Sequence, residues 1–286
     1  MKKSKTNALL SGKLSLIALV FFMLSNISFG SVRNNINPAD KKISNEFNIS
    51  LFNPIVTGNP SLDIDKAKKE GKAVFLVITG TGAAGLDKAI TMAKEANGKV
   101  SKSVLIQINR DDKGNNSLVT KLGIANVPVP FIMVISHKGV AAGGYPSTQA
   151  TSDLLVKAVP SPKQDEVLFA ISEKKPVYIV VSKKGLTDKT TVLANCKSAS
   201  TKVTSKPAIV EFDINDSKES AFLKQIGITS ITDKTITLVV NTAGQLTDKY
   251  EGIALESALM GSANKVIKSS GCAPGACGSG KKGCGK

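Results

Sequence analysis

Three of the four cysteines lie close enough together near the C-terminus to do chemistry as a group. Cys272, Cys277 and Cys284 stand in residues 269–286, a segment rich in Gly, Ser and Lys whose composition predicts a flexible, exposed tail. Neighbouring lysines favour the thiolate form, which both metal binding and disulfide exchange need. Three thiolates leave a tetrahedral zinc site one ligand short, but they suit a soft metal ion. The odd number of thiols also fits an intermolecular disulfide or a free reactive thiol, and a tether with incidental cysteines is a third interpretation.

The other residues with reactive side chains are isolated in the sequence. Cys196 stands alone and is predicted to be a small, buried apolar residue. His137, the only histidine, has no evident partner and is expected to be an exposed residue of a hairpin. With one histidine, His-rich metal sites are excluded, and no serine or cysteine can be paired with a base from the sequence. The acids at the ends of predicted strands are interpreted as solvated loop residues rather than as a carboxylate pair: Asp111, Asp112, Asp213 and Asp216.

A glycine motif follows the first predicted strand. Gly80, Gly82 and Gly85 fit the G-x-G-x-x-G pattern of dinucleotide-binding proteins, and Asp111 ends the next strand. The context argues against a dinucleotide, because the unit has a hairpin after its third strand where a further βαβ half is needed. No such motif occurs in the second half of the chain. The glycines are therefore interpreted as a turn from strand to helix that needs unusual backbone angles.

The elements that position these residues occur twice. Four blocks of the first half match four blocks of the second half in the same order, at an offset near 104 residues: 72–77 with 175–180, 106–112 with 210–216, 122–124 with 226–228, and 131–135 with 236–240. Four ordered matches at nearly one offset predict a tandem duplication. Two copies also agree with a chain of 286 residues, which exceeds the usual length of one domain.

Within the first copy, strands and helices are predicted to alternate. The continuous apolar run 73–79 indicates a strand that is buried on both faces of a sheet. The remaining elements are predicted as a helix over 83–96, a strand over 104–108, a helix over 115–122, a hairpin of 131–136 and 140–144, and a closing helix over 147–159. Pro160 and Pro162 mark the boundary between the copies, because two prolines in three residues cannot continue a helix or a sheet.

This order of elements resembles a thioredoxin-like domain. The resemblance covers residues 60–158 and is carried by residues 67–72, 79–82, 108–112 and 123–131. It implies an α/β fold of two tandem domains, each with a central mixed sheet flanked by helices. It also implies that Pro130, rather than Pro128, is the structural cis-proline of the family. Residues 166–268 resemble the family in element order only, since 228–235 contains no proline.

The chain departs from the family at its redox motif. The family has Cys-x-x-Cys at the start of the helix after the first central strand, and the matching positions here run from Ala83 to Leu86 without a cysteine. The corresponding segment of the second copy, 182–186, also lacks cysteine. Dithiol exchange needs an acidified thiol and a second thiol that resolves the mixed disulfide. We therefore expect neither domain to be a disulfide oxidoreductase.

The N-terminus predicts export. A lysine-rich start, an apolar run over 14–24 and small residues before Ser31 are typical of a cleavable signal peptide, so the protein is expected in the periplasm or outside the cell. Because the signal contains four lysines and no acid, cleavage lowers the formal net charge from +16 to +12. The lysines are scattered and tryptophan is absent, which argues against specific nucleic-acid binding. No later segment is long and apolar enough to span a membrane.

The predicted organisation follows from these boundaries. It comprises a signal peptide (1–30), an N-terminal extension (31–59), a first thioredoxin-like domain (60–159), a linker (160–165), a divergent second domain (166–268) and the tail (269–286). We expect a redox-inactive, non-enzymatic protein that binds protein partners or takes part in assembly, with no cofactor. The alternative is a thiol-redox or soft-metal-handling protein that works through the tail. The oligomeric state stays open.

Overall fold

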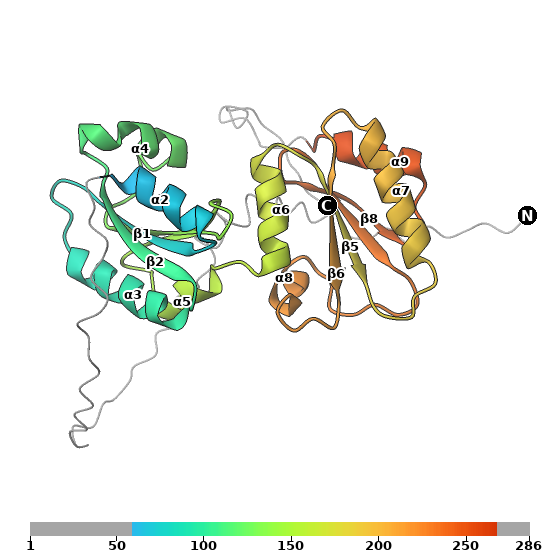
Figure 1. Cartoon of the computed structure of the whole chain (residues 1–286), viewed down its shortest axis with the longest axis horizontal. Coiled ribbons are helices and arrows are strands. Elements are labelled where there is room, and N and C mark those ends of the chain that lie inside the picture. The colour runs from blue at the N-terminus through green and yellow to red at the C-terminus, as the bar shows by residue number, and fades with distance from the viewer. Residues whose placement is uncertain (1–58, 268–286) are drawn as a thin grey trace, which may run out of the picture.

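The computed structural model describes residues 59–267, which form two domains with one sheet each. The predicted signal peptide, the extension before Asn59 and the cysteine-bearing tail lie outside the described residues. Figure 1 shows the two domains side by side, with helix α6 (Pro162–Ser172) between the two sheets. Within residues 59–267, no helix combines the length and the apolar composition that crossing a membrane requires.

Domain 1 is a four-stranded mixed sheet covered by helices. Its elements are α2 (Pro60–Lys69), β1 (Ala73–Thr79), α3 (Leu86–Lys99), β2 (Ser103–Asn109), η2 (Lys113–Asn115), α4 (Asn116–Leu122), β3 (Phe131–Ile135), β4 (Ala141–Pro146) and α5 (Ser152–Lys157). The strand order is β2-β1-β3-β4. Strands β1 and β2 are parallel, whereas β3 is antiparallel to both of its neighbours. Every residue of β1 is buried, as its continuous apolar sequence predicts.

Domain 2 repeats this arrangement. Its elements are α6, β5 (Val177–Ser182), α7 (Lys189–Lys202), β6 (Ala208–Asp213), α8 (Ser220–Gln225), β7 (Ile236–Val240), β8 (Leu246–Glu251) and α9 (Glu256–Asn264). The order is β6-β5-β7-β8, again with one parallel and two antiparallel pairs. Val74 pairs with Ile135 in domain 1, and Val177 pairs with Val240 in domain 2, which confirms the offset of the repeat.

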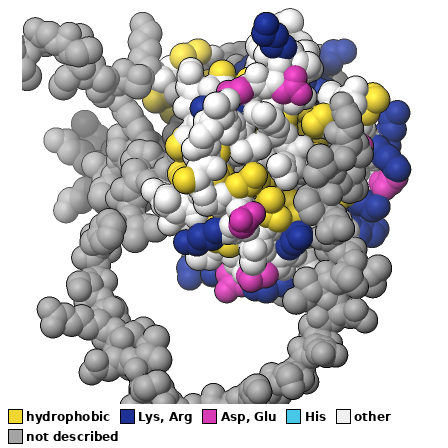
Figure 2. Space-filling view, turned by 90° about the vertical axis from the view of Figure 1, so that its left-hand side faces the viewer, with side chains coloured by type: hydrophobic (Ala, Val, Ile, Leu, Met, Phe, Trp, Pro, Cys, Tyr) yellow, Lys and Arg dark blue, Asp and Glu magenta, His cyan; other side chains and the backbone are white. Residues whose placement is uncertain are grey.

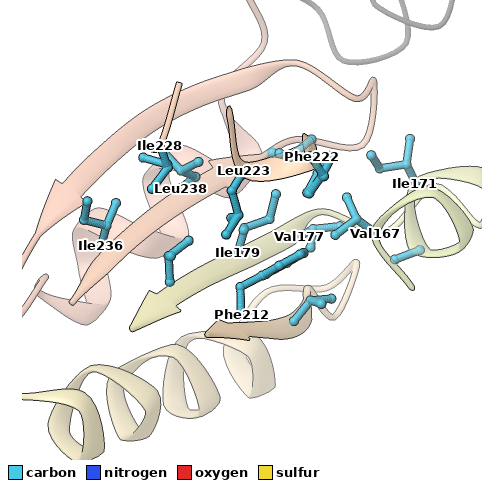
Figure 3. Close-up of a cluster of buried hydrophobic side chains, with 14 of the residues drawn as sticks. Val167, Ile171, Val177, Ile179, Phe212, Phe222, Leu223, Ile228, Ile236 and Leu238 are labelled. Atoms are coloured by element: carbon cyan, nitrogen blue, oxygen red, sulfur yellow. The ribbon is translucent and has the colours of Figure 1, made fainter. Parts of the chain in front are cut away.

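Each sheet has a hydrophobic core on both faces. In domain 1, α2 and α4 cover one face, and α3 and α5 cover the other. In domain 2, α6 and α8 pack on one face, and α7 and α9 pack on the other. Figure 3 shows the first of these domain 2 layers, in which the rings of Phe212 and Phe222 lie 5.5 Å apart. The result is three layers per domain, with the sheet in the middle.

Two predicted boundaries are wrong for reasons that involve single residues. The helix predicted over 83–96 is α3, which begins later, at Leu86, because Gly85 has φ 80° and stands outside the helix as its N-cap. The linker predicted over 160–165 is shorter, because α6 already begins at Pro162. Proline is favourable in the first turn of a helix, and Ser161 and Gln164 form a capping box there.

The closing helix of domain 1 is also shorter than predicted. The prediction spans 147–159, and the observed α5 spans Ser152–Lys157. Thr151 caps the start of this helix by accepting a hydrogen bond from Leu154 N–H at 3.2 Å. The residues before Thr151 belong to the turn that follows β4.

Candidate functional site

The candidate site is the edge of the domain 1 sheet at which the parallel strands β1 and β2 end. The loop from β1 to α3, residues 80–85, lies at the far left of domain 1 in Figure 1. Gly82 and Gly85 have φ of 70° and 80°, which supports the interpretation of the glycine motif as a turn with unusual backbone angles. Open α/β sheets commonly bind their ligands beyond the carboxyl ends of the strands.

Asp111 ties this loop to its neighbours. Its Oδ2 accepts a hydrogen bond from Thr81 N–H at 2.6 Å, and its Oδ1 lies 3.6 Å from Arg110 Nε. The hydrogen bond from Thr81 and the nearby Arg110 guanidinium hold the pKa of the Asp111 carboxyl below its usual value. Arg110 in turn donates to the Val127 carbonyl. Asp111 is exposed, as predicted for a solvated loop acid, and together with Arg110 it links the loops that follow β1, β2 and α4.

Gly80 is required where the loop leaves β1. A Cβ atom at this position would lie 2.9 Å from Asp111 Oδ2, closer than real Cβ contacts. The glycine thus leaves room for the carboxylate that the loop binds. This close approach is a structural reason for the first glycine of the motif, and it needs no dinucleotide.

The positions of the missing redox motif carry apolar side chains that are half-buried. Ala83 and Leu86 are half-buried, and so are Val127 and Val129 from the loop before β3. Pro130 is buried, and the Val129–Pro130 peptide bond is cis, at the position that the resemblance gives to the cis-proline. Figure 2 views this side of domain 1 and shows hydrophobic side chains at the centre of the face with charged side chains around them. Among residues 59–267, this edge of domain 1 carries apolar side chains and no cysteine.

The same edge of domain 2 has a different arrangement. Asp188 is the N-cap residue of α7, as Gly85 is of α3, and Thr235 precedes β7 as Pro130 precedes β3. Asp188 accepts hydrogen bonds from Thr235 N–H at 2.9 Å and from its Oγ1 hydroxyl at 2.8 Å. Domain 1 cannot form these bonds, because glycine has no carboxylate and proline has no N–H.

Domain 2 also has a shallow hollow of about 360 Å³ beside this position. Lys183, Lys184 and Lys189 line it together with Glu211 and other residues. Lys189 Nζ lies 3.2 Å from Glu211 Oε2, and Lys183 donates to the Ile231 carbonyl at 3.1 Å. Since two of the three lysines are engaged within the protein, we assign no ligand to this hollow.

Cys196 lies in the core of domain 2, as the sequence predicts. Its side chain is fully buried in the layer of α7 and α9, and it is a free thiol. Burial raises the pKa of the Cys196 thiol to about 11, against a smaller opposing effect of the Thr237 hydroxyl. The thiol lies well inside α7, away from the helix start, and therefore lacks the environment of a reactive cysteine.

The prediction that His137 has no partner is wrong. Its Nδ1 lies 3.9 Å from Oδ2 of the buried Asp165, which belongs to α6 of the other domain. The remaining predicted loop acids accept hydrogen bonds from backbone N–H groups within their own turns. Asp112 accepts from Gly114, Asp213 from Asn215, and Asp216 from Lys218.

Three residues of the two edges and the domain contact are missing from the candidates predicted from sequence: Asp165, Asp188 and Thr235. The repeat offset places Thr235 opposite Pro130, and that signal could have identified it. In the part of the chain that the structure describes, no group of three or more His, Cys, Asp or Glu residues is placed to hold a metal ion. The proposed tail ligands, Cys272, Cys277 and Cys284, lie outside that part.

The comparisons with known proteins reach only distant structures. No protein-family model and no curated protein sequence match the chain. The chain is similar to the first two thioredoxin domains of Saccharomyces cerevisiae Eps1p, with 12% identity, a TM-score of 0.28, and coverage of 76% of this chain and 99% of that chain. It is also similar to ERdj5, with 14% identity, a TM-score of 0.33, and coverage of 74% and 27%. Zinc-bound human ERp44 is similar at 9% identity, with a TM-score of 0.29 and coverage of 72% and 57%.

These identities and TM-scores are too low to transfer any site, so the fold assignment rests on the topology of this chain. Counted within each domain, both sheets have the order 4-3-1-2, and the third strand is antiparallel to the others. Helices cover both faces of each sheet. The described chain is therefore a tandem pair of thioredoxin-like domains.

Proposed function

We propose that this protein is an exported thioredoxin-like tandem that does not catalyse disulfide exchange and that binds protein partners or takes part in assembly. The observation that carries the proposal is the chemistry of the domain 1 edge. Ala83 and Leu86 stand where the redox thiols would be, so this edge presents a half-buried apolar surface there, and Val127 and Val129 of the loop before β3 are half-buried as well. Such a surface favours contact with apolar side chains of a partner.

The cysteine content of the domains supports the absence of redox catalysis. Cys196 is the one cysteine among residues 59–267, and it is buried with a raised pKa. A buried, protonated thiol is a poor nucleophile and has no second thiol beside it for resolution. The proposal therefore assigns Cys196 a packing role.

The domain 2 edge supports a structural role for the second domain. The Asp188 carboxylate occupies both donors of Thr235, so the groups that could face a ligand there bind each other instead. We therefore propose that domain 1 binds the partner and that domain 2 has a structural role.

The proposal of export rests on the signal-like N-terminus, and the proposed location is the periplasm or the medium outside the cell.

The rival function is redox or soft-metal chemistry by the tail, which the cluster of Cys272, Cys277 and Cys284 favours. The two functions differ in which part of the chain carries reactive thiols.

Reduction of insulin by dithiothreitol separates these functions. We expect the purified chain, and the same chain shortened to end at Ile267, to leave the uncatalysed rate of insulin precipitation unchanged, because neither domain has an accessible thiol. An authentic dithiol thioredoxin serves as the positive control. Activity that disappears with the tail would support the rival function, and activity that survives the deletion would overturn the proposed one.

A further inference from the structure

The two domains meet where helix α6 of domain 2 faces the β3–β4 turn and helix α2 of domain 1. Helix α6 of domain 2 lies between the sheets in Figure 1, and its Asp165 faces the turn between β3 and β4 of domain 1. Lys138 N–H donates to Asp165 Oδ2 at 3.1 Å and also to the Ser136 hydroxyl oxygen at 3.2 Å. The imidazole of His137 approaches the same carboxylate oxygen at 3.9 Å. A carboxylate of one domain is thus held by a turn of the other.

The Asp165 side chain is buried at this contact, and one of its two carboxyl oxygens has no hydrogen bond to replace those it would make with water. Its side chain is 3% exposed, and among the described residues its Oδ1 atom has no hydrogen-bond partner. A buried polar atom without a partner is costly, and a buried charge is costlier. Burial raises the pKa of Asp165 above its usual value, although the Ser136 hydroxyl, the Lys138 N–H and the charges of His137 and Lys138 act in the opposite direction.

Two lysines of domain 1 lie over an aromatic ring of α6 at this contact. Lys138 Nζ lies 5.5 Å from the centre of the Phe169 ring, which stands one turn along α6 from Asp165. Lys68 Nζ from α2 approaches the same ring at 5.6 Å. On α6 itself, Glu166 pairs with Lys163 within the helix, with a distance of 3.0 Å. Lys138 of the turn and Lys68 of α2 therefore place two cations over this part of α6, with His137 beside them.

We propose that Asp165 makes the contact between the two domains sensitive to pH, so that uptake of one proton from solvent strengthens the docking of α6 on the β3–β4 turn. The proton neutralises the buried carboxylate and leaves the other contacts of the helix in place. Docking would then hold the two sheets in one relative orientation at low pH and release them as the pH rises. An exported protein meets the pH of its surroundings directly.

The sign of the effect follows from the pKa of Asp165 in the two states. In the docked state the carboxyl is buried and its pKa is raised, whereas separation of the domains returns the carboxyl to water. The docked state therefore binds the proton more tightly, so docking strengthens as the pH falls through the raised pKa and weakens as the pH increases through it. Between the undocked and docked pKa values, the docking equilibrium changes by up to about tenfold per pH unit.

The test uses the full chain and two readouts between pH 4 and pH 8. Hydrogen exchange, corrected for the intrinsic pH dependence of exchange, measures the protection of the 136–140 turn and α6. Small-angle X-ray scattering measures whether the two domains keep one separation. We expect the unmodified protein to show greater protection and a smaller radius of gyration at low pH.

Two variants locate the titrating group. Asp165→Asn carries the neutral side chain at every pH, so its protection and radius of gyration should no longer change with pH. Glu166→Gln removes the same charge from the adjacent position of α6, where the carboxylate pairs within the helix, and it should behave like the unmodified protein. His137→Gln should keep the pH dependence.

Three results would overturn the inference: an unmodified protein whose domain contact does not respond to pH, a contact that weakens at low pH, or a pH response that is kept in Asp165→Asn. The unmodified protein alone supplies the first two results, so the test does not depend on folding of the variants. None of these results bears on redox activity, and the outcome is independent of the insulin assay.

Discussion

Cysteines introduced together at Ala83 and Leu86 will give this protein a disulfide reductase activity that we expect the unmodified chain to lack. Leu86 is the first residue of α3, and Ala83 precedes it by three positions in the loop. Thiols at a helix N-terminus are acidified by the exposed N–H groups and the helix dipole, and two of them at this spacing can attack and resolve a mixed disulfide. We expect a rate of insulin reduction on the order of tenfold above that of dithiothreitol alone, because a thiol whose pKa is lowered by about one unit holds about tenfold more thiolate at neutral pH than an ordinary thiol.

Asp111 should limit this engineered activity. Its carboxylate, whose pKa is lowered by the hydrogen bond from Thr81, is ionised at neutral pH beside the new thiols and opposes formation of the thiolate. Addition of Asp111→Asn to the double variant should therefore increase the rate further. The matched control is Ala83→Ser with Leu86→Ser, which should stay inactive. A folded double-cysteine variant that neither forms an internal disulfide nor reduces insulin would contradict the equivalence of these positions to the redox motif.

Asp188→Ala will destabilise domain 2 strongly. The substitution removes the acceptor of two hydrogen bonds from Thr235, a residue that is fully buried, and it leaves both donors unpaired. A buried unpaired donor costs ~1–3 kcal/mol, so with two such donors we expect the free energy of unfolding of domain 2 to fall by about 2–6 kcal/mol. Urea unfolding monitored by hydrogen exchange of peptides from each domain measures this loss, and peptides of domain 1 should keep their protection.

Variants with related chemistry test the cause of that loss. Thr235→Ser retains both donors and should unfold near the unmodified protein, whereas Thr235→Val loses the hydroxyl and should show part of the effect. Asp233→Ala removes an exposed carboxylate that accepts a hydrogen bond from the Thr232 hydroxyl, and it should leave the urea midpoint for unfolding of domain 2 unchanged. Equal destabilisation by Asp188→Ala and Asp233→Ala would show that lost negative charge, and not the bond to Thr235, is responsible.

The sequence predicts the fold where one physical signal dominates. A continuous apolar run such as 73–79 buries both of its faces when it forms a central strand between two helical layers. The repeat extends the prediction of such a strand to the second domain. Boundaries are less predictable because they depend on the conformation of single residues. The left-handed angle of Gly85 delays α3, and Pro162, which read as a helix breaker, starts α6.

The sequence predicts where the candidate site lies and that it lacks the redox thiols. It does not predict the hydrogen bonds that the loops of the site form with each other. The Thr81–Asp111 and Asp188–Thr235 bonds join residues 30 and 47 positions apart, and sequence patterns do not report such contacts between loops. Asp165 is a similar case. Its place in the first turn of α6 reads as ordinary helix capping, and its burial becomes visible only when domain 1 is in position.

The most direct test of the central claim, that the two domains carry no exchangeable thiol, uses the full chain with Cys272, Cys277 and Cys284 changed to serine. The folded protein is equilibrated in glutathione buffers from reducing to oxidising, quenched with acid and weighed by mass spectrometry. We predict one unmodified protein mass in every buffer, and a single thiol, Cys196, that is alkylated only after unfolding, because it is buried and its pKa is raised to about 11. A glutathione adduct on Cys196 in the folded protein, rising as the buffer becomes more oxidising, would contradict it.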